Sequence, residues 1–316
     1  MRDRSALVAL AVFLLIVLCC ALAPVYADWA GVQPFKSTLN AVIPIDGQDR
    51  PVMELPTEGL ALGYTPIGPT WDLGNYFLGA DNQGRDVMAR LLYGGLNSFA
   101  IAGAATLFTL VFATAFGLLA GFFGGLIDMI LSRILDVMWA FPVYLLAISL
   151  SIVLITEGIT IGPVVIDSGS IFLPIFIIGL IYIPYVARPI RGQVMALRNS
   201  DFVMASIGLG APPLRILRKD ILPNIATTLI VFVPIMMALN MLTESALSFL
   251  SIGVQPPDAS WGTIIQDGQT LLYTRPAVAL APGLMIVASV LSLNVFGDGL
   301  RDALDPKSKI KLGRST

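Results

Sequence analysis

Long runs of apolar residues alternate with short polar segments along the 316 residues of this chain. A helix needs about 20 consecutive apolar residues to cross the hydrocarbon core of a bilayer. The pattern therefore predicts an all-α integral membrane protein with six membrane-spanning helices. These are expected at about residues 6–27, 99–123, 128–155, 171–187, 224–250 and 277–295.

The first apolar run has two interpretations. It follows Arg2 and Arg4 and ends in the sequence VYA before Asp28, which also resembles the cleavage site of a secretory signal peptide. However, the run is longer than the roughly 7 to 15 residues of a signal peptide's apolar region. A retained anchor helix within residues 1–27 is therefore favoured, with a cleaved signal as the alternative.

The segment after the anchor is polar, rich in proline and rich in acidic residues, which predicts an extracytoplasmic loop or cap. Near its end, Asp86 precedes an amphipathic stretch with Val87, Leu91 and Leu92 on one side, which predicts an interfacial helix. The predicted organisation is an N-terminal transmembrane anchor helix at 1–27, this segment at 28–97, a five-helix core at 98–300 that includes a polar loop at 188–223, and a tail at 301–316.

The basic residues predict the orientation of the spans, because cytoplasmic loops carry an excess of lysine and arginine. With six spans, 14 basic residues fall on one side of the membrane and five on the other. Both termini and the 188–223 loop lie on the side with 14, so the N and C termini are expected in the cytoplasm. The five basic residues expected outside are Lys36, Arg50, Arg85, Arg90 and Arg275.

The composition agrees with a membrane protein and excludes several kinds of chemistry. Hydrophobic residues make up 56% of the chain and charged residues 13%, whereas soluble domains contain about 25% charged residues. The chain has no histidine, and its two cysteines, Cys19 and Cys20, are adjacent in an apolar run. This inventory excludes a disulfide framework, a zinc cluster and histidine-dependent catalysis. Nucleic acid is not an expected partner.

Motifs that hold nucleotides are also missing. The sequence contains no Gly-x-x-x-x-Gly-Lys-Ser/Thr phosphate cradle, and GLGAPP at 208–213 has Pro213 where a dinucleotide-binding motif needs its third glycine. No cofactor is therefore expected in this chain. If ATP and Mg²⁺ are used, a partner must bind them.

The polar loop at 188–223 predicts two short helices joined by a glycine hinge. Gly210 can end the first helix, and the second is expected to stop at Pro223. The residues that offer N-cap oxygens to the first helix are Asn199, Ser200 and Asp201.

The spacing in this loop resembles the cytoplasmic coupling loop of ABC importer permeases. That pattern is Glu-Ala-Ala, three residues, glycine, nine residues, a hydrophobic residue, any residue and Leu-Pro. Met204 replaces the glutamate here, and Ser206 replaces an alanine. The resemblance implies that the loop docks on a separate ATPase subunit. The residues expected to carry this docking are Asp201, Met204, Ala205, Ser206, Gly210, Leu222 and Pro223.

Three other segments resemble the dipeptide, oligopeptide and nickel branch of the same family. They are LGADNQGRDV at 78–87, SFLSIGVQPPDASWG at 248–262 and GDGLRDALDP at 297–306. Ala80 replaces a threonine of the first signature, and Ser251 replaces a glycine of the second. Trp261 also suits a belt of aromatic residues at the membrane interface, which is the alternative explanation for it.

Taken together, these resemblances imply a type I ABC importer permease subunit, not itself an enzyme, in a bacterial or archaeal cytoplasmic membrane. Its expected partners are a homologous second permease subunit, two cytoplasmic ATPase subunits that bind ATP and Mg²⁺, and an extracytoplasmic solute-binding protein. Peptides are the first expectation for the solute, with nickel or other small solutes as alternatives.

Two acidic residues within the predicted spans are candidates for a transport pathway. Asp136 is three residues from Arg133 and is expected to pair with it. Glu244 lies near the outer end of the fifth span, where it is expected to reach the interface, with a place on the pathway as the alternative. The alternative function is a secondary transporter or channel that uses Asp136 and Glu244.

Overall fold

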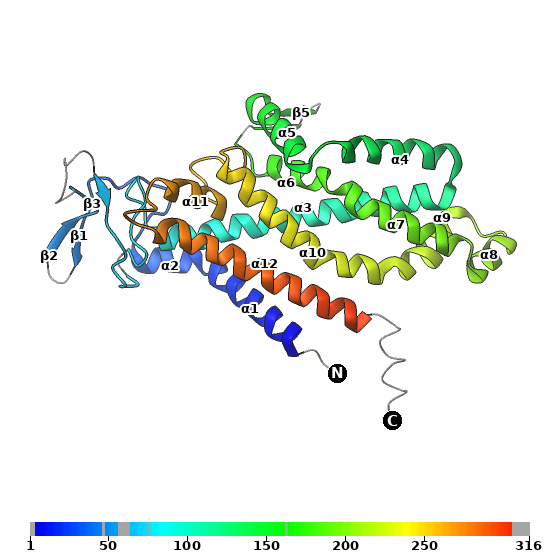
Figure 1. The fold of residues 1–316 in the computed structure, drawn as a ribbon, viewed down its shortest axis with the longest axis horizontal. Coiled ribbons are helices and arrows are strands. Elements are labelled where there is room, and N and C mark those ends of the chain that lie inside the picture. The colour runs from blue at the N-terminus through cyan, green and yellow to red at the C-terminus, as the bar shows by residue number, and fades with distance from the viewer. Residues whose placement is uncertain are drawn as a thin grey trace.

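The computed structural model describes residues 4–45, 48–55, 64–74, 76–161, 164–167 and 169–304. These residues form an elongated bundle of helices (Figure 1). The helices are α1 Arg4–Ala21, α2 Ala23–Ala30, α3 Val87–Phe123, α4 Gly125–Ala140, α5 Val143–Glu157, α6 Phe172–Ile181, α7 Ile183–Arg198, α8 Asp201–Gly208, α9 Pro213–Ile216, α10 Leu222–Phe249, α11 Trp261–Gln269 and α12 Ala277–Leu304.

Short strands accompany the helices, although an all-α fold was predicted. They form three antiparallel pairs, β1 with β2, β3 with β4 and β5 with β6. All of them lie between candidate spans, so the membrane region is helical as expected. The strands are β1 Val42–Ile45, β2 Gln48–Pro51, β3 Met53–Glu54, β4 Thr65–Pro66, β5 Ile159–Ile161 and β6 Val164–Ile166.

The described part of the chain contains four to six candidate membrane spans by length and composition, and the upper number agrees with the six predicted. Two more spans are counted only if α4 and α5 together form one span and α6 and α7 together form another. The chain bends by 90° between α4 and α5 and by 43° between α6 and α7. The four single helices that qualify are Arg4–Ala21, Val87–Phe123, Pro213–Phe249 and Ala277–Leu304.

The third predicted span, 128–155, is not one straight helix, because the chain bends sharply between α4 and α5. Phe141 has an extended backbone there, with φ −89° and ψ 139°, and Pro142 precedes α5. Proline disfavours the helical conformation of the residue before it, which explains the break. The apolar content of the run does not reveal this bend.

α3 joins two elements that were predicted as separate. The interfacial helix after Asp86 and the second span at 99–123 form one helix of 37 residues. Gly94 and Gly95 do not interrupt it, because α11 packs directly against both of them. An added Cβ would lie 2.9 Å from Ile264 Cδ1 at Gly94 and 2.9 Å from a Trp261 ring carbon at Gly95. This tertiary contact offsets the weak helix propensity of glycine.

The polar loop predicted at 188–223 is largely helical. α7 continues to Arg198, so the fourth span extends into the predicted loop. The second short helix does not stop at Pro223, because a π-turn at Leu217–Ile221 connects α9 to α10 without a break. In a regular α-helix the ring of Pro223 would collide with the carbonyl of Lys219, four residues earlier. The π-turn contains Lys219 and widens the helix there, which accommodates the proline.

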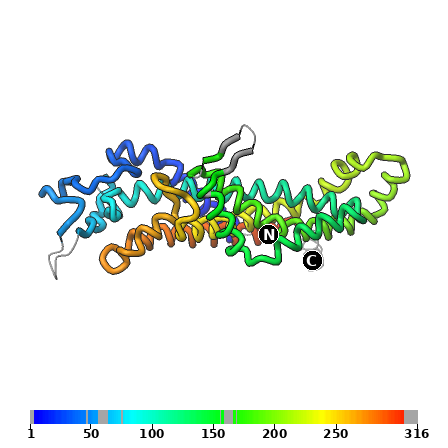
Figure 2. The backbone as a smooth tube through the Cα atoms, turned by 90° about the horizontal axis from the view of Figure 1, so that it is seen from above, coloured from blue at the N-terminus to red at the C-terminus, as the bar shows by residue number. Residues whose placement is uncertain are grey.

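The elements separate into two ends. α8 lies at one end of the bundle, and β1, β2 and β3 lie at the other (Figure 1). The view in Figure 2 shows the same separation. The first turn of α1 and the last turn of α12 are directed toward the α8 end (Figure 1). Because basic residues are concentrated around α8, the positive-inside rule assigns this end to the cytoplasm. The basic tail residues beyond Leu304 lie outside the described residues.

Glycines allow α3 to approach α7 closely, as the four-residue spacing of Gly117 and Gly121 suggests. A Cβ added to Gly117 would lie 2.6 Å from Ile190 Cγ2, and one added to Gly121 would lie 2.8 Å from Val194 Cβ. Because backbones this close leave no room for a side chain, small residues at these positions determine how tightly the two helices pack.

We expect Gly121→Ala to destabilise the protein, because the added methyl group would collide with Val194 and with the backbone oxygen of Arg191. Overpacking of this kind costs about 1–3 kcal/mol. Gly103→Ala is the matched control, since an added Cβ at Gly103 in the same helix has nothing within 4 Å. Thermal unfolding in detergent should show a lower midpoint for Gly121→Ala only. Equal midpoints for the two variants would contradict this packing.

Candidate functional site

Residues 201–223, which we call the hinge segment, form the tip of the α8 end of the molecule (Figure 1). Ser200 takes the N-cap position before α8, with an extended backbone at φ −77° and ψ 152°. Asp201 follows in the first turn, where a negative charge interacts favourably with the helix dipole. Val203 is completely buried and anchors α8 to the rest of the bundle.

Gly210 ends α8 in a Schellman motif, a turn that needs a residue in the left-handed conformation. Its φ is +76°. The N–H of Gly210 donates to the carbonyl oxygen of Ile207 at 2.9 Å, and the N–H of Ala211 donates to that of Ser206 at 3.1 Å. No atom of the other described residues lies within 4 Å of a Cβ added to Gly210. The glycine turn is therefore present as predicted, and it requires glycine for its backbone conformation and not for space.

The hinge segment exposes apolar side chains beside basic ones. Leu209 is 88% exposed, Leu214 is 76% exposed, and Arg215, Arg218 and Lys219 are also exposed. Clustered exposed apolar side chains are typical of a surface that binds another protein. Among the residues predicted to dock, Asp201, Met204, Ala205, Gly210 and Pro223 are exposed, whereas Ser206 and Leu222 are half-buried.

Ion pairs connect α4 to α7 next to the hinge segment. Arg191 donates two hydrogen bonds to the carboxylate of Asp128, at 2.5 and 2.6 Å. Arg188 Nη2 lies 2.9 Å from Asp136 Oδ1. The predicted pair of Asp136 with Arg133 is confirmed at 3.8 Å. Asp136 is thus neutralised by two arginines, and this pairing explains its position without a transported solute.

At the opposite end of the bundle, a buried ion cluster joins the start of α3 to α11. Arg85 Nη2 and Arg90 Nη1 lie 3.0 and 2.9 Å from Asp267 Oδ2. Arg85 Nε also lies 2.7 Å from Asp81 Oδ2, which pairs with Arg90 as well. Asp267 was not among the predicted functional residues. The sequence did contain a signal for it, because Arg85 and Arg90 lie on the side of the membrane where few basic residues are expected. Arginines that are buried there need acidic partners, and Asp267 is one of them.

Trp261, in the signature at 248–262, packs on the part of α3 that follows the signature at 78–87. Its side chain is completely buried, and its indole N–H donates to the carbonyl oxygen of Leu91 at 2.9 Å. Its ring meets that of Phe99 edge to face, with centroids 5.1 Å apart. The alternative explanation for Trp261, a place in an interfacial belt, is therefore wrong. Segments far apart in the sequence pack together here and fix α11 on α3.

Glu244 was expected to reach the membrane interface, but it does not. It is completely buried in α10, and it accepts hydrogen bonds from the hydroxyl groups of Ser98 and Ser248. The reason is that the outer end of α10 is covered by α3 and α11, so this position faces other helices and not lipid. The idea that Glu244 lies on a transport pathway stays a prediction.

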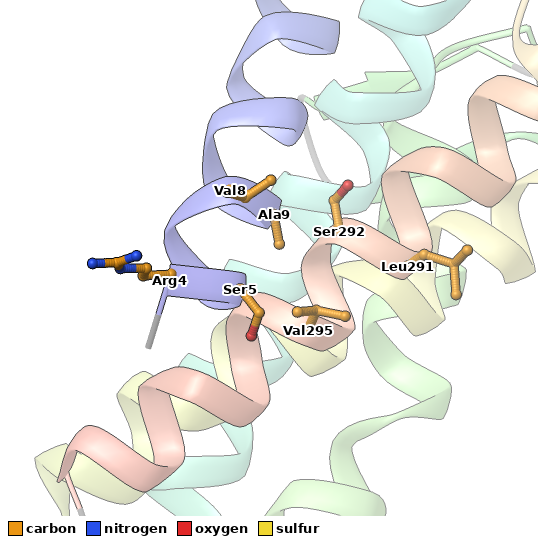
Figure 3. Close-up of a pocket in the computed structure, with 7 residues that line it drawn as sticks. All are labelled: Arg4, Ser5, Val8, Ala9, Leu291, Ser292 and Val295. Atoms are coloured by element: carbon orange, nitrogen blue, oxygen red, sulfur yellow. The ribbon is translucent and has the colours of Figure 1, made fainter. Parts of the chain in front are cut away.

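A surface groove lies between α1 and α12, away from both groups of charged residues (Figure 3). None of the residues predicted to dock or to line a pathway borders it. Across the described ranges, no group of three or more histidine, cysteine, aspartate or glutamate residues is placed to hold a metal ion. The residues that line the groove are Arg4, Ser5, Val8, Ala9, Leu291, Ser292 and Val295.

Asp86 is the N-cap residue of α3, and its Oδ1 accepts a hydrogen bond from the N–H of Ala89 at 2.6 Å. Its Oδ2 is buried and has no hydrogen-bond partner among the residues that the structure describes. Burial raises the pKa of Asp86 from 3.8 to about 6, although the bond from Ala89 acts in the opposite direction. The carboxylate of Asp81 contributes to the same rise.

The sequence matches known transport proteins. Residues 113–310 match the family model described as binding-protein-dependent transport system inner membrane component. The dipeptide transport system permease protein DppC of Alkalihalophilus pseudofirmus is 37% identical, over 74% of this chain and 73% of that protein. The di/tripeptide transport system permease protein DppC of Pseudomonas aeruginosa is 33% identical, over 98% of this chain and 90% of that protein.

The fold is similar to that of a solved transporter chain. A chain of the inward-facing MetNI methionine ABC transporter superposes with a TM-score of 0.55 and 19% sequence identity. The similarity covers 69% of this chain and 97% of that one. At this level of identity the comparison shows a shared fold, that of a type I importer permease.

The raised pKa of Asp86 predicts a pH-dependent stability. The folded protein holds this proton more tightly than the unfolded chain, so the contribution of Asp86 to stability is greatest below pH 4 and is lost as the pH rises to about 6. A rise from 3.8 to about 6 corresponds to about 3 kcal/mol. We therefore expect the stability of the wild type relative to Asp86→Asn to fall over this range.

Thermal unfolding in detergent between pH 4 and pH 7 measures this difference. Asp86→Ser is the matched control, because serine also accepts the N-cap hydrogen bond and does not titrate. Both variants should show the same altered pH dependence. A wild type that changes with pH in parallel with both variants would exclude a raised pKa at Asp86.

Proposed function

The chain belongs to the family of binding-protein-dependent transport system inner membrane components, and we propose that it forms half of the translocation pore of an ATP-driven peptide importer. The other half would be a homologous second permease subunit. Two cytoplasmic ATPase subunits would bind ATP and Mg²⁺, and an extracytoplasmic solute-binding protein would deliver the solute. The membrane would be the cytoplasmic membrane of a bacterium or an archaeon.

The exposed turn at Gly210 is the observation that best supports a docking role for the hinge segment. Leu209 and Leu214 flank this turn and are largely exposed, which is costly unless a partner covers them. α8 is held to the bundle by Val203, so a force on these side chains is passed to the helices behind them. We propose that a groove in an ATPase subunit covers this surface and that rigid-body movement follows ATP binding.

Peptides are proposed as the solute because of what the relatives are called. The two matched permease proteins are named for dipeptides and for di- and tripeptides. Selectivity in such a system would depend largely on the solute-binding protein, so nickel and other small solutes are the alternatives to be tested. The identity of the solute does not affect the proposed coupling.

A secondary transporter or channel is not favoured. Asp136, which such a carrier would use, is paired with Arg133 and Arg188. An exposed apolar turn at the cytoplasmic end has no purpose in a carrier that works alone. The family match also points to a transporter with several subunits.

Uptake of a labelled dipeptide into vesicles that contain the complete set of subunits distinguishes the two functions. We expect uptake to require ATP and to continue when ionophores collapse the ion gradients at constant ATP. Vesicles without the ATPase subunits are the control and should not accumulate the dipeptide. Loss of uptake on adding ionophores, with ATP unchanged, would support the secondary transporter instead.

Gly210→Val should uncouple ATP hydrolysis from uptake, because a β-branched residue is strained at φ +76° and would distort the turn. Gly208→Val is the matched control, since Gly208 ends α8 without a left-handed backbone and also has nothing within 4 Å of an added Cβ. We expect at least tenfold lower uptake for Gly210→Val, with normal amounts of protein in the membrane. Wild-type uptake by this variant would exclude a coupling role for the turn.

A further inference from the structure

Glu244 is an acidic side chain that is completely buried in a membrane-spanning helix. Its Oε2 accepts a hydrogen bond from Ser98 Oγ of α3 at 2.9 Å, and its Oε1 accepts one from Ser248 Oγ of α10 at 2.7 Å. Ser245 Oγ lies 3.4 Å from Oε2. Among the described residues, no lysine or arginine forms an ion pair with Glu244. Hydroxyl groups therefore compensate for the burial of this carboxyl group.

Two of these serines also bind the backbone of the outer segment. Ser98 Oγ accepts a hydrogen bond from the N–H of Trp261, the first residue of α11, at 3.2 Å. Ser248 Oγ accepts one from the N–H of Val254 at 3.1 Å. Each hydroxyl group has one proton, which it gives to Glu244, so its lone pairs remain available for the backbone N–H. Glu244 thus orients both serines as acceptors.

The surrounding glycines show how closely the three helices meet at Glu244. A Cβ added to Gly94 of α3 would lie 3.1 Å from the carbonyl carbon of Ser260. One added to Gly262 of α11 would lie 2.8 Å from Ser248 Cβ. The turn between α10 and α11 is therefore pressed against both helices, and a rotation of either serine would leave a backbone N–H of this buried region without its acceptor.

α11 is thus held at both of its ends. Glu244 acts near its N-terminus through Ser98, and Arg85 and Arg90 hold Asp267 near its C-terminus. Of these two attachments, only the one through Glu244 includes a residue of α10, the helix that begins at the hinge segment. The hydrogen bonds through Glu244 therefore connect α10 to α11 in addition to the direct packing at Gly262, where an added Cβ would lie 2.8 Å from Ser245 Cα.

We infer that Glu244 is a positioning residue for transport, which makes the turn at 250–260 and the start of α11 move together with α10. Glu244 contacts no solute in this role. It sets the orientation of Ser98 and Ser248, and through them the position of the outer segment. The inference rests on the proposed importer function, because it gives that function a way to move the outer end of the pore.

Glutamine at position 244 tests this role, because it keeps the size of the side chain but replaces an acceptor with an NH₂ donor. One serine hydroxyl group then loses the acceptor for its proton and must rotate. In the complete importer, we expect Glu244→Gln to speed amide hydrogen exchange about tenfold in the peptide that contains Val254 or in the one that contains Trp261, because the N–H bound to the rotated serine loses a buried acceptor. Uptake per ATP hydrolysed should fall at least fivefold.

Single serine variants separate the two connections and remain informative if Glu244→Gln does not fold. Ser248→Ala should speed exchange at Val254 only, and Ser98→Ala at Trp261 only. Ser289→Ala is the matched control, because Ser289 is a buried serine of α12 whose hydroxyl group has no hydrogen-bond partner among the described residues, so both exchange and uptake should be unchanged. Glu244→Asp, which keeps the carboxyl group, should restore part of the uptake lost in Glu244→Gln.

Wild-type exchange at Val254 and Trp261 in Glu244→Gln would overturn the inference, as would faster exchange with unchanged uptake per ATP. Failure of the proposed function gives a different result. In that case the wild type itself would show no ATP-dependent uptake, whereas the exchange rates of the variants would still report whether Glu244 positions the outer segment.

Discussion

One continuous helix connects the hinge segment at one end of this protein to the outer turn at the other end. The helix runs from Pro213 to Phe249 and spans 37 residues, or about 55 Å at 1.5 Å per residue. It begins at the exposed turn of the hinge segment and ends one turn after Glu244. Because its backbone hydrogen bonds resist stretching, a shift applied at the hinge segment is transmitted to the outer turn. The interpretation of both functional regions depends on this continuity.

The bilayer explains why this helix tolerates unusual features. Inside a membrane each backbone polar group needs an internal partner, and prolines remove donors. The π-turn accommodates Pro223, and Pro234 lies within the helix next to Gly297 of α12, where an added Cβ would lie 3.1 Å from the proline ring. Charged groups follow the same rule. Asp128 binds Arg191, the outer arginines bind Asp81 and Asp267, and Glu244 is surrounded by serines.

Much of the architecture can be predicted from the sequence, because apolar runs and basic loops respond directly to the membrane. The left-handed turn at Gly210 and the helix that begins after Asp86 were also predictable, since glycine and N-cap residues act locally. The bend at Pro142 was not predicted, because the sequence offers only a single proline within an apolar run. The strand pairs were missed because their pairing depends on residues outside each strand.

The roles of Glu244, Trp261 and Asp267 could not be predicted from the sequence. Each role depends on which faces of α3, α10 and α11 pack against each other. From the sequence alone, a carboxylate near the end of a span fits the membrane interface as well as it fits a buried site. The structure shows that α3 and α11 cover Glu244. In the sequence, Asp267 resembles any solvated acidic residue of an outer loop. Only the structure shows that Arg85 and Arg90 lie beside it. The signatures at 78–87 and 248–262 marked segments near this contact, but only the fold shows that Trp261 binds Leu91 of α3, four residues after the first signature.

The most direct test of this account measures distances between spin labels at Leu214 and Leu250, which are exposed at the two ends of the long helix. The labels are compared in the complete importer before and after ATP binding is trapped. A rigid helix predicts that the distance within one chain stays at about 54 Å, while the distance from Leu250 to a label on the second permease subunit changes. A shorter distance within the chain, with Leu250 fixed relative to the second subunit, would show that the helix bends and would contradict the account.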